Sequence, residues 1–118
     1  MTDPADMAQR QLDAYNAHDL EAFAACYHED VEVRDFPAQT LRIQGRAELR
    51  ARYGPLFEKH PELHAELVQR SEQGAVVVDK ERVTGMGSEV VFALAIYEVE
   101  GDLIRRVWFA RPREEASS

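Results

Sequence analysis

Apolar positions early in the chain recur with the spacing of an α-helix. One stretch repeats through Ala8, Leu12 and Tyr15, and a second repeats through Leu20, Phe23, Ala24 and Tyr27. Spacing of i, i+3, i+4 and i+7 predicts two amphipathic helices, each with one buried face. The polar stretch 16–19 separates them, and Asp19 is a typical N-cap for the second helix.

A third helix is predicted after Gly45. Its apolar stripe consists of Leu49, Tyr53, Leu56 and Phe57. Pro55 falls inside this stripe, and proline removes a helical N–H and clashes with the preceding turn. We therefore expect the helix to kink near Gly54–Pro55 or to begin anew there.

The rest of the chain has the period of β-strands. Residues 31–35 alternate apolar and polar side chains after a polar turn at 28–30, and a short run at 40–43 pairs beside them. Four longer apolar segments, separated by glycine turns, follow at about 62–73, 75–85, 88–100 and 102–111. Short glycine connections imply antiparallel hairpins. The sequence thus predicts one α+β domain over residues 1–112, followed by a loose tail at 113–118.

One strand has no polar side. Every residue from Val90 to Ile96 is apolar, so we expect both faces of this strand to be covered. Helices cover one face, and a second copy of the chain covers the other, which predicts a homodimer through the sheet. The alternative is that the small residues Ala93 and Ala95 tolerate partial exposure.

Charge argues against polyanionic partners. The formal net charge of the chain is -8 and its pI is about 4.9. Nucleic-acid binding depends on clustered Lys and Arg, so we expect none. We also expect no membrane segment, because no stretch approaches the roughly 20 apolar residues that span a bilayer.

Cysteine and histidine usage predicts neither a disulfide nor a metal site. Cys26 is the single cysteine and lies between apolar helix positions, so we expect a buried thiol in a protein of the reducing cytoplasm. Among the four histidines only His60 and His64 have helical spacing, and Pro61 interrupts them. The chain also has no glycine-rich phosphate loop and no nucleophile elbow. We therefore expect neither metal nor cofactor.

Asp35 is a candidate catalytic base. It shares a strand face with Val31 and Val33, and that face points inward if Glu32 and Arg34 point out. Partial burial raises the pKa of a carboxylate into the range useful for proton transfer near neutral pH. The alternative is that Asp35 caps the following turn at Phe36–Pro37.

Two later strands carry further charged candidates. Asp79 and Glu81 share one face of their strand, and alternation does not decide whether this face is inside. If it is, both acids need a cationic partner such as Arg70 or Arg106. Arg106 and Trp108 share a face of the last strand with Ile104, an arrangement that suits an anionic or aromatic ligand or a structural ion pair.

The order of elements resembles a known family. The resemblance rests on the stretches 15–23, 27–35 and 45–46 and on the closing strands 96–101 and 104–109. Over nearly the whole chain these are similar to the nuclear-transport-factor-two-like superfamily, which includes ketosteroid isomerases and SnoaL-like polyketide cyclases. The resemblance implies a cone-shaped α+β barrel in which three N-terminal helices pack on a strongly curved, mostly antiparallel sheet that encloses a pocket.

The resemblance also implies a role for Asp35, which matches the proton-shuttling aspartate of ketosteroid isomerases. The other catalytic groups do not match. Gln11 stands where that enzyme has a tyrosine, and an apolar residue around Val90 stands where it has a protonated acid.

Two functions are consistent with these residues. The first is proton transfer, isomerisation or cyclisation of a small apolar carbonyl compound with Asp35 as the base. The second is a non-catalytic ligand-binding or accessory dimer. In both, the partner is a small apolar or aromatic molecule, and the expected ligand-binding residues are Tyr15, Phe36, Phe57, Asp79, Glu81, Arg106 and Trp108.

Overall fold

The structure, a computed structural model, describes residues 3–110. The predicted tail at 113–118 lies outside the described residues. The elements in chain order are α1 (Pro4–Asn16), α2 (Leu20–Ala25), β1 (Tyr27–Asp35), β2 (Leu41–Gln44), α3 (Arg46–Lys59), β3 (His64–Gln73), β4 (Val76–Thr84), β5 (Val91–Glu100) and β6 (Leu103–Ala110). The predicted α+β class is therefore confirmed.

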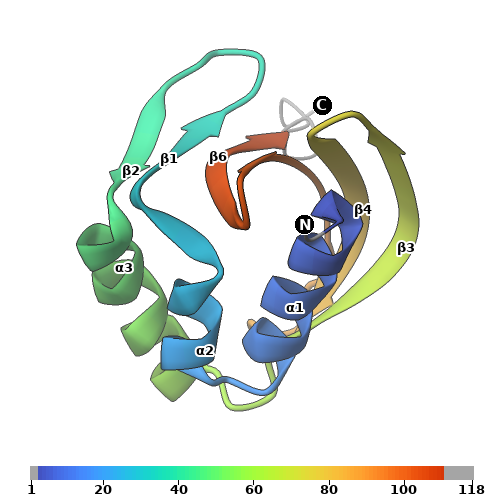
Figure 1. Cartoon of the computed structure of the whole chain (residues 1–118). Helices are drawn as coiled ribbons and strands as arrows, with labels where there is room; N and C mark the ends of the chain where they lie inside the picture. The colour runs from blue at the N-terminus through green and yellow to red at the C-terminus, as the bar shows by residue number, and fades with distance from the viewer. Residues whose placement is uncertain (1–2, 111–118) are drawn as a thin grey trace.

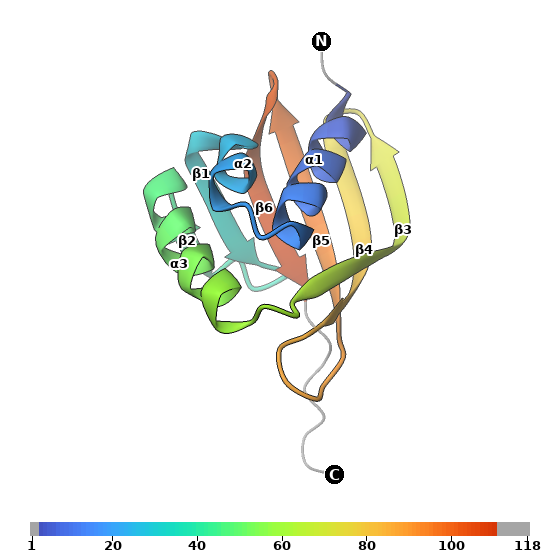
Figure 2. The ribbon, with the colours of Figure 1, turned by 90° about the horizontal axis from the view of Figure 1, so that it is seen from below.

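The six strands form one curved sheet in the order β2-β1-β6-β5-β4-β3. All neighbours are antiparallel except β1 and β6, which are parallel. The three helices lie on the same side of the sheet, which bends around them (Figure 1). Figure 2 shows the same helices in front of the strands. The sheet does not close into a barrel, since β2 and β3 remain its two edges.

Local sequence signals set the ends of the first two helices. The side chain of Asp3 accepts a hydrogen bond from the Ala5 N–H at 3.0 Å and caps α1, and Asp19 caps α2 through the Ala22 N–H at 3.1 Å. The break between them is tied to the sheet. Asn16 bonds the backbone N–H and carbonyl of Ala65 at 2.8 and 2.9 Å, which holds the end of α1 at the start of β3.

Two local expectations need correction, and one of the two outcomes expected at Pro55 does not occur. Tyr27, expected on the stripe of the second helix, begins β1, and the expected polar turn at 28–30 belongs to that strand. An irregularity of register between Tyr27 and Glu32 accommodates these polar residues. The third helix does not begin anew at Pro55 but continues as one element to Lys59.

Both acids of β4, Asp79 and Glu81, face the interior of the fold. Val77, Asp79, Glu81 and Val83 are buried, whereas Lys80 and Arg82 are exposed. A bulge at Val68 in β3 makes this possible, because it shifts the strand by one residue and turns Arg70 inward opposite Asp79. The interior of the fold thus contains an arginine and two carboxyl groups.

The residues from 3 to 110 contain no helix that is both long and apolar enough to cross a membrane. The thiol of Cys26 is buried, as expected, and donates to the carbonyl oxygen of Ala22 at 3.4 Å. The cytoplasmic location stays a prediction.

The loop between β4 and β5 yields a test of the chain path. Gly85 and Gly87 both have positive φ, 94° and 99°, so alanine strains either backbone by about 1–2 kcal/mol. A Cβ at Gly85 would also collide with the backbone of Glu62, whereas nothing lies within 4 Å of one at Gly87. We expect Gly85→Ala to lower the free energy of unfolding in urea by about 2 kcal/mol more than Gly87→Ala. Equal losses would contradict this packing.

Candidate functional site

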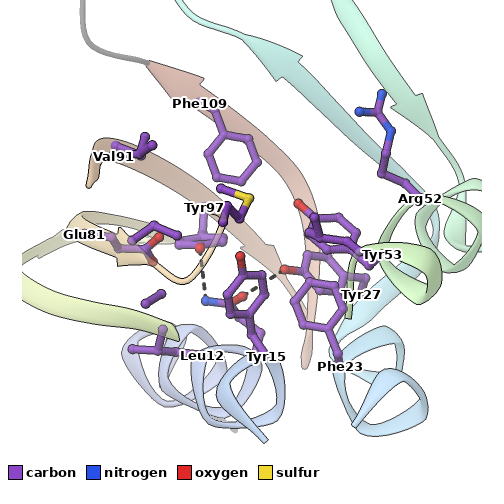
Figure 3. Close-up of a pocket in the computed structure, with 16 residues that line it drawn as sticks. Leu12, Tyr15, Phe23, Tyr27, Arg52, Tyr53, Glu81, Val91, Tyr97 and Phe109 are labelled. Carbon is purple, nitrogen blue, oxygen red and sulfur yellow. Dashed lines mark hydrogen bonds between the residues drawn. The ribbon is translucent and has the colours of Figure 1, made fainter. Parts of the chain in front are cut away.

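A cavity of about 280 Å³ lies between the helices and the inner face of the sheet. Most of its wall is apolar, contributed by Leu12, Phe23, Leu56, Val83, Val91 and Phe109. Four tyrosines also line it: Tyr15 from α1, Tyr27 from β1, Tyr53 from α3 and Tyr97 from β5. Figure 3 shows these rings around one space. The cavity therefore combines apolar walls with several hydroxyl groups, which suits a small organic ligand.

Glu81 is the one carboxyl group on the wall of this cavity within the described part of the chain. It belongs to a chain of hydrogen bonds across the interior. Tyr27 donates to Oε1 of Gln11 at 3.1 Å, Nε2 of Gln11 donates to the hydroxyl of Tyr97 at 3.0 Å, and Tyr97 bonds the carboxyl of Glu81. Because each partner is buried, this chain orients the Glu81 carboxyl from the helix side.

Burial raises the pKa of Glu81 to about 7, and the negative charge of Asp79 adds to the rise. Arg70 and the hydrogen bond from Tyr97 oppose it. Arg70 does not neutralise Glu81 because its guanidinium binds Asp79 at both ends, with N–O distances of 2.7 and 2.9 Å. A carboxyl group with such a pKa exchanges protons readily near neutral pH.

Tyr15, Tyr27 and Tyr97 remain neutral donors. Burial raises the pKa of Tyr15, and the neighbouring Tyr53 and Glu81 add to the rise. Burial likewise raises the pKa values of Tyr27 and Tyr97. The hydroxyl of Tyr15 makes no hydrogen bond with any residue between 3 and 110 and points into the cavity (Figure 3), so it can donate to a ligand oxygen.

Asp35 lies outside this cavity, in an adjoining groove of about 520 Å³. Its Oδ2 accepts from Nε of Arg42 at 2.7 Å and lies 2.6 Å from Nη2 of the same side chain. Its backbone also closes the following turn, since its carbonyl accepts from the Gln39 N–H at 2.9 Å. Asp35 thus faces the helix-covered side of the sheet, as the alternation predicted, but lines the groove rather than the cavity.

The structure brings together only part of the predicted ligand-binding set. Tyr15 and Glu81 line the cavity, and Phe36, 44% exposed, lines the groove with Asp35. Phe57 packs behind the cavity wall, its ring centroid 5.4 Å from that of Tyr15. Asp79 is fully buried and is bound to Arg70 rather than to open space.

Arg106 and Trp108 lie on the outer face of the sheet. Arg106 pairs with Glu98 at 2.6 Å, and the indole N–H of Trp108 donates to Gln39 at 3.0 Å. The expected shared face with Ile104 is wrong, because β6 has an extra residue, Arg105, opposite the Glu98–Val99 step of β5. This bulge turns Ile104 inward, whereas Arg106 and Trp108 point outward.

Four residues of the site are not identified by the sequence patterns. Helical spacing places Tyr27 and Tyr53 on helix stripes, Tyr97 falls within a strand, and Gln11 stands out only as a mismatch with ketosteroid isomerases. One signal in the sequence points to them: each places a polar group on an otherwise apolar face, and a buried phenol or amide needs a hydrogen-bond partner. Residues 3–110 contain no group of three metal-binding side chains.

Comparison with protein families identifies the fold. The model of the SnoaL-like domain matches residues 8–107. The chain belongs to the SnoaL-like domain family. The superfamily expected from its motifs is therefore confirmed. No curated protein matches the sequence.

Solved structures share the fold of this chain. An uncharacterised cystatin-fold protein from Novosphingobium aromaticivorans is 26% identical with a TM-score of 0.84, covering 92% of this chain and 98% of its own. A SnoaL-like protein of unknown function from Burkholderia thailandensis is 19% identical, with a TM-score of 0.78 and coverages of 92% and 93%. A protein from Catenulispora acidiphila with a ketosteroid isomerase-like fold, in complex with trimethylamine, is 13% identical, with a TM-score of 0.73 and coverages of 87% and 82%.

The raised pKa of Glu81 predicts a pH-dependent stability. The unfolded chain releases this proton at lower pH than the folded protein, so the free energy of unfolding falls as pH rises toward about 7 and levels off above it. We expect Glu81→Gln to remove this fall and to gain on the order of 2–3 kcal/mol over the wild type at about pH 8, with little difference at about pH 5. Urea unfolding across this range measures it.

Glu66→Gln is the matched control, because Glu66 is an exposed carboxylate on the neighbouring strand. This variant should keep the pH profile of the wild type. Parallel profiles for wild type and Glu81→Gln would show that Glu81 ionises normally.

Proposed function

We propose that this SnoaL-like domain catalyses proton transfer on a small apolar carbonyl compound, with Glu81 as the acid–base group and without a cofactor. The observation that carries the proposal is the buried carboxyl of Glu81 on the wall of an apolar cavity that also contains the hydroxyl of Tyr15. This pairs a base with a hydrogen-bond donor, the two groups that enolisation requires.

The reaction has two steps. The Glu81 carboxylate removes a proton from the carbon next to the ligand carbonyl, and the electron pair moves onto the carbonyl oxygen, where Tyr15 donates a hydrogen bond. The protonated Glu81 then returns the proton to another carbon of the enolate. The proton is conserved and the double bond moves, so the net change is an isomerisation. If the enolate carbon instead attacks a second carbonyl of the ligand, a C–C bond forms, the C=O π bond opens to an alkoxide, and the alkoxide takes the proton back from Glu81, which gives cyclisation.

The cavity volume limits the ligand. A cavity of about 280 Å³ is at the lower end of the range of 300–1,000 Å³ that is typical of ligand pockets. This favours a compact compound of one or two rings over an extended polycyclic one.

Asp35 remains the alternative base. Asp35 lines the adjoining groove rather than the cavity, and its carboxylate is held in an ion pair with Arg42. Glu81 is free of such a bidentate cation and lies deeper. Both observations favour Glu81 over Asp35 for a ligand inside the cavity.

The second candidate is a binding module without turnover. The rings of Tyr15, Phe23 and Tyr53 cluster within 6.2 Å of each other beside one acidic group, an arrangement that holds an apolar or cationic ligand as well as a carbonyl compound. In this case ligand affinity depends on Glu81 but no product forms.

We also propose that two copies pair through the outer face of the sheet. Phe92 is 47% exposed there, and Leu94, Ile96 and Trp108 continue the apolar strip across β5 and β6. Glu98, which flanks the strip, is paired with Arg106, so a second copy can cover the strip without burying that carboxylate alone. An exposed apolar strip of this kind favours self-association.

Conversion of 3-cyclohexenone to conjugated 2-cyclohexenone, followed by ultraviolet absorbance, tests the enzymatic proposal. We expect the wild-type rate to rise with pH through about 7 as Glu81 ionises, and Glu81→Gln to lower it about a hundredfold or more. Asp35→Asn is the matched comparison and should retain most of the rate. Loss in Asp35→Asn alone would assign the base to Asp35. Saturable binding of the ketone without turnover would contradict catalysis and support the second candidate, a binding module.

Phe92→Glu tests the pairing of copies. A charge in the strip should oppose its burial, so sedimentation velocity should show a dimer for the wild type and a monomer for this variant. Val68→Glu is the control, since Val68 is 51% exposed but lies at the bulge of edge strand β3. A monomeric wild type would exclude the interface.

A further inference from the structure

The cavity and the groove lie side by side and share part of their lining. Arg52, Tyr53 and Phe109 line both of them. Arg52 comes from α3, on the opposite side of the cavity from Glu81 (Figure 3). A ligand in the cavity can therefore reach the guanidinium of Arg52, which belongs to the lining of both spaces.

Among residues 3–110, the charged residues that line the groove are two arginines and one aspartate. Arg42 and Asp35 neutralise each other in the groove, and the neighbouring Arg50 on α3 is paired with Glu21 at 3.0 Å. Arg52 makes no ion pair or hydrogen bond with any residue from 3 to 110. The groove is thus locally positive in a chain whose formal net charge is -8.

We infer that the substrate is an anionic carbonyl compound, a keto-carboxylate or a similar acid, whose apolar part and carbonyl occupy the cavity while its anionic group binds Arg52 in the groove. This inference rests on the proposed function and narrows its substrate: the part of the compound inside the cavity stays small and apolar, and the compound carries an anionic group outside it. Arg52 is exposed, and its planar guanidinium can bind both oxygens of a carboxylate. Arg52 acts here as a specificity residue, since it lies away from the reacting carbon.

The separation of the two charged groups supports one orientation of the ligand. The acid–base group Glu81 and the cation Arg52 lie on opposite walls, β4 and α3. An anionic group placed beside Glu81 would meet a carboxylate and the negative charge of Asp79 next to it. The same group at the groove meets a cation, so electrostatics orients the carbonyl end toward Glu81.

A matched pair of probes tests the inference: 4-oxo-4-phenylbutanoate and its methyl ester, which differ only in the anionic group. Calorimetric titration of the wild type at low ionic strength should find the acid bound about fivefold more tightly than the ester. Arg52→Gln should abolish or reverse this preference, and Arg52→Lys should retain part of it. Added salt should reduce it in the wild type.

Arg50→Gln is the control, because it removes an arginine from the same helix that already has an acidic partner; it should leave the preference unchanged. Equal binding of acid and ester by the wild type, an unchanged ratio in Arg52→Gln, or no binding of either probe would overturn the inference.

Proton exchange on the same probes separates this result from the proposed function. In D₂O, exchange of the protons beside the ketone of the methyl ester, followed by NMR, should depend on Glu81, and Arg50→Gln should leave it unchanged. Exchange of the ester without any preference for the acid would overturn the anionic substrate and support the proton transfer. A preference for the acid without exchange would support the anionic ligand and contradict catalysis.

Discussion

The bidentate ion pair between Arg70 and Asp79 is the interaction on which the interior depends. Asp79 is completely buried, and a buried carboxylate without a partner would be very unfavourable. With Arg70 turned inward by the bulge at Val68, the acidic side of β4 can face the helices instead of the solvent. Glu81 lies two residues further along the same face of β4 and therefore reaches the cavity wall. Arg70 does not neutralise it, because Arg70 is already bound to Asp79. One extra residue in β3 thus determines both the packing of the sheet and the chemistry of the site.

Much of the architecture was predictable from local patterns. Helical spacing, the N-cap Asp19 and the glycine turns located the three helices and the long strands, because these signals act over a few residues. The bulges at Val68 and Arg105 were not predictable, since a bulge is set by the partner strand rather than by the sequence around it. The outward position of Arg106 and Trp108 follows directly from the second bulge.

The sequence predicts on which faces several residues of the site lie, but not how these residues are arranged relative to one another. Alternation placed Asp35 on the inner side of β1, and Tyr15 on a buried helix face, from the sequence alone. The choice between the two faces of β4 depended on Arg70, a residue in another strand. The hydrogen-bonded chain from Tyr27 through Gln11 and Tyr97 to Glu81 joins residues up to 86 positions apart. No local pattern contains such an arrangement, which is why Glu81 could be proposed but not singled out.

The open sheet also affects how the protein behaves in a crowded solution. β3 is an edge strand, and the unpaired N–H and carbonyl groups of such an edge are a template for strands from other molecules. Its bulge at Val68 interrupts the regular ladder, and the exposed side chain of Glu72 places negative charge along it. An incoming strand would meet a distorted register and like charges in a chain that is itself acidic. The same bulge that turns Arg70 inward therefore protects the fold from edge-to-edge aggregation.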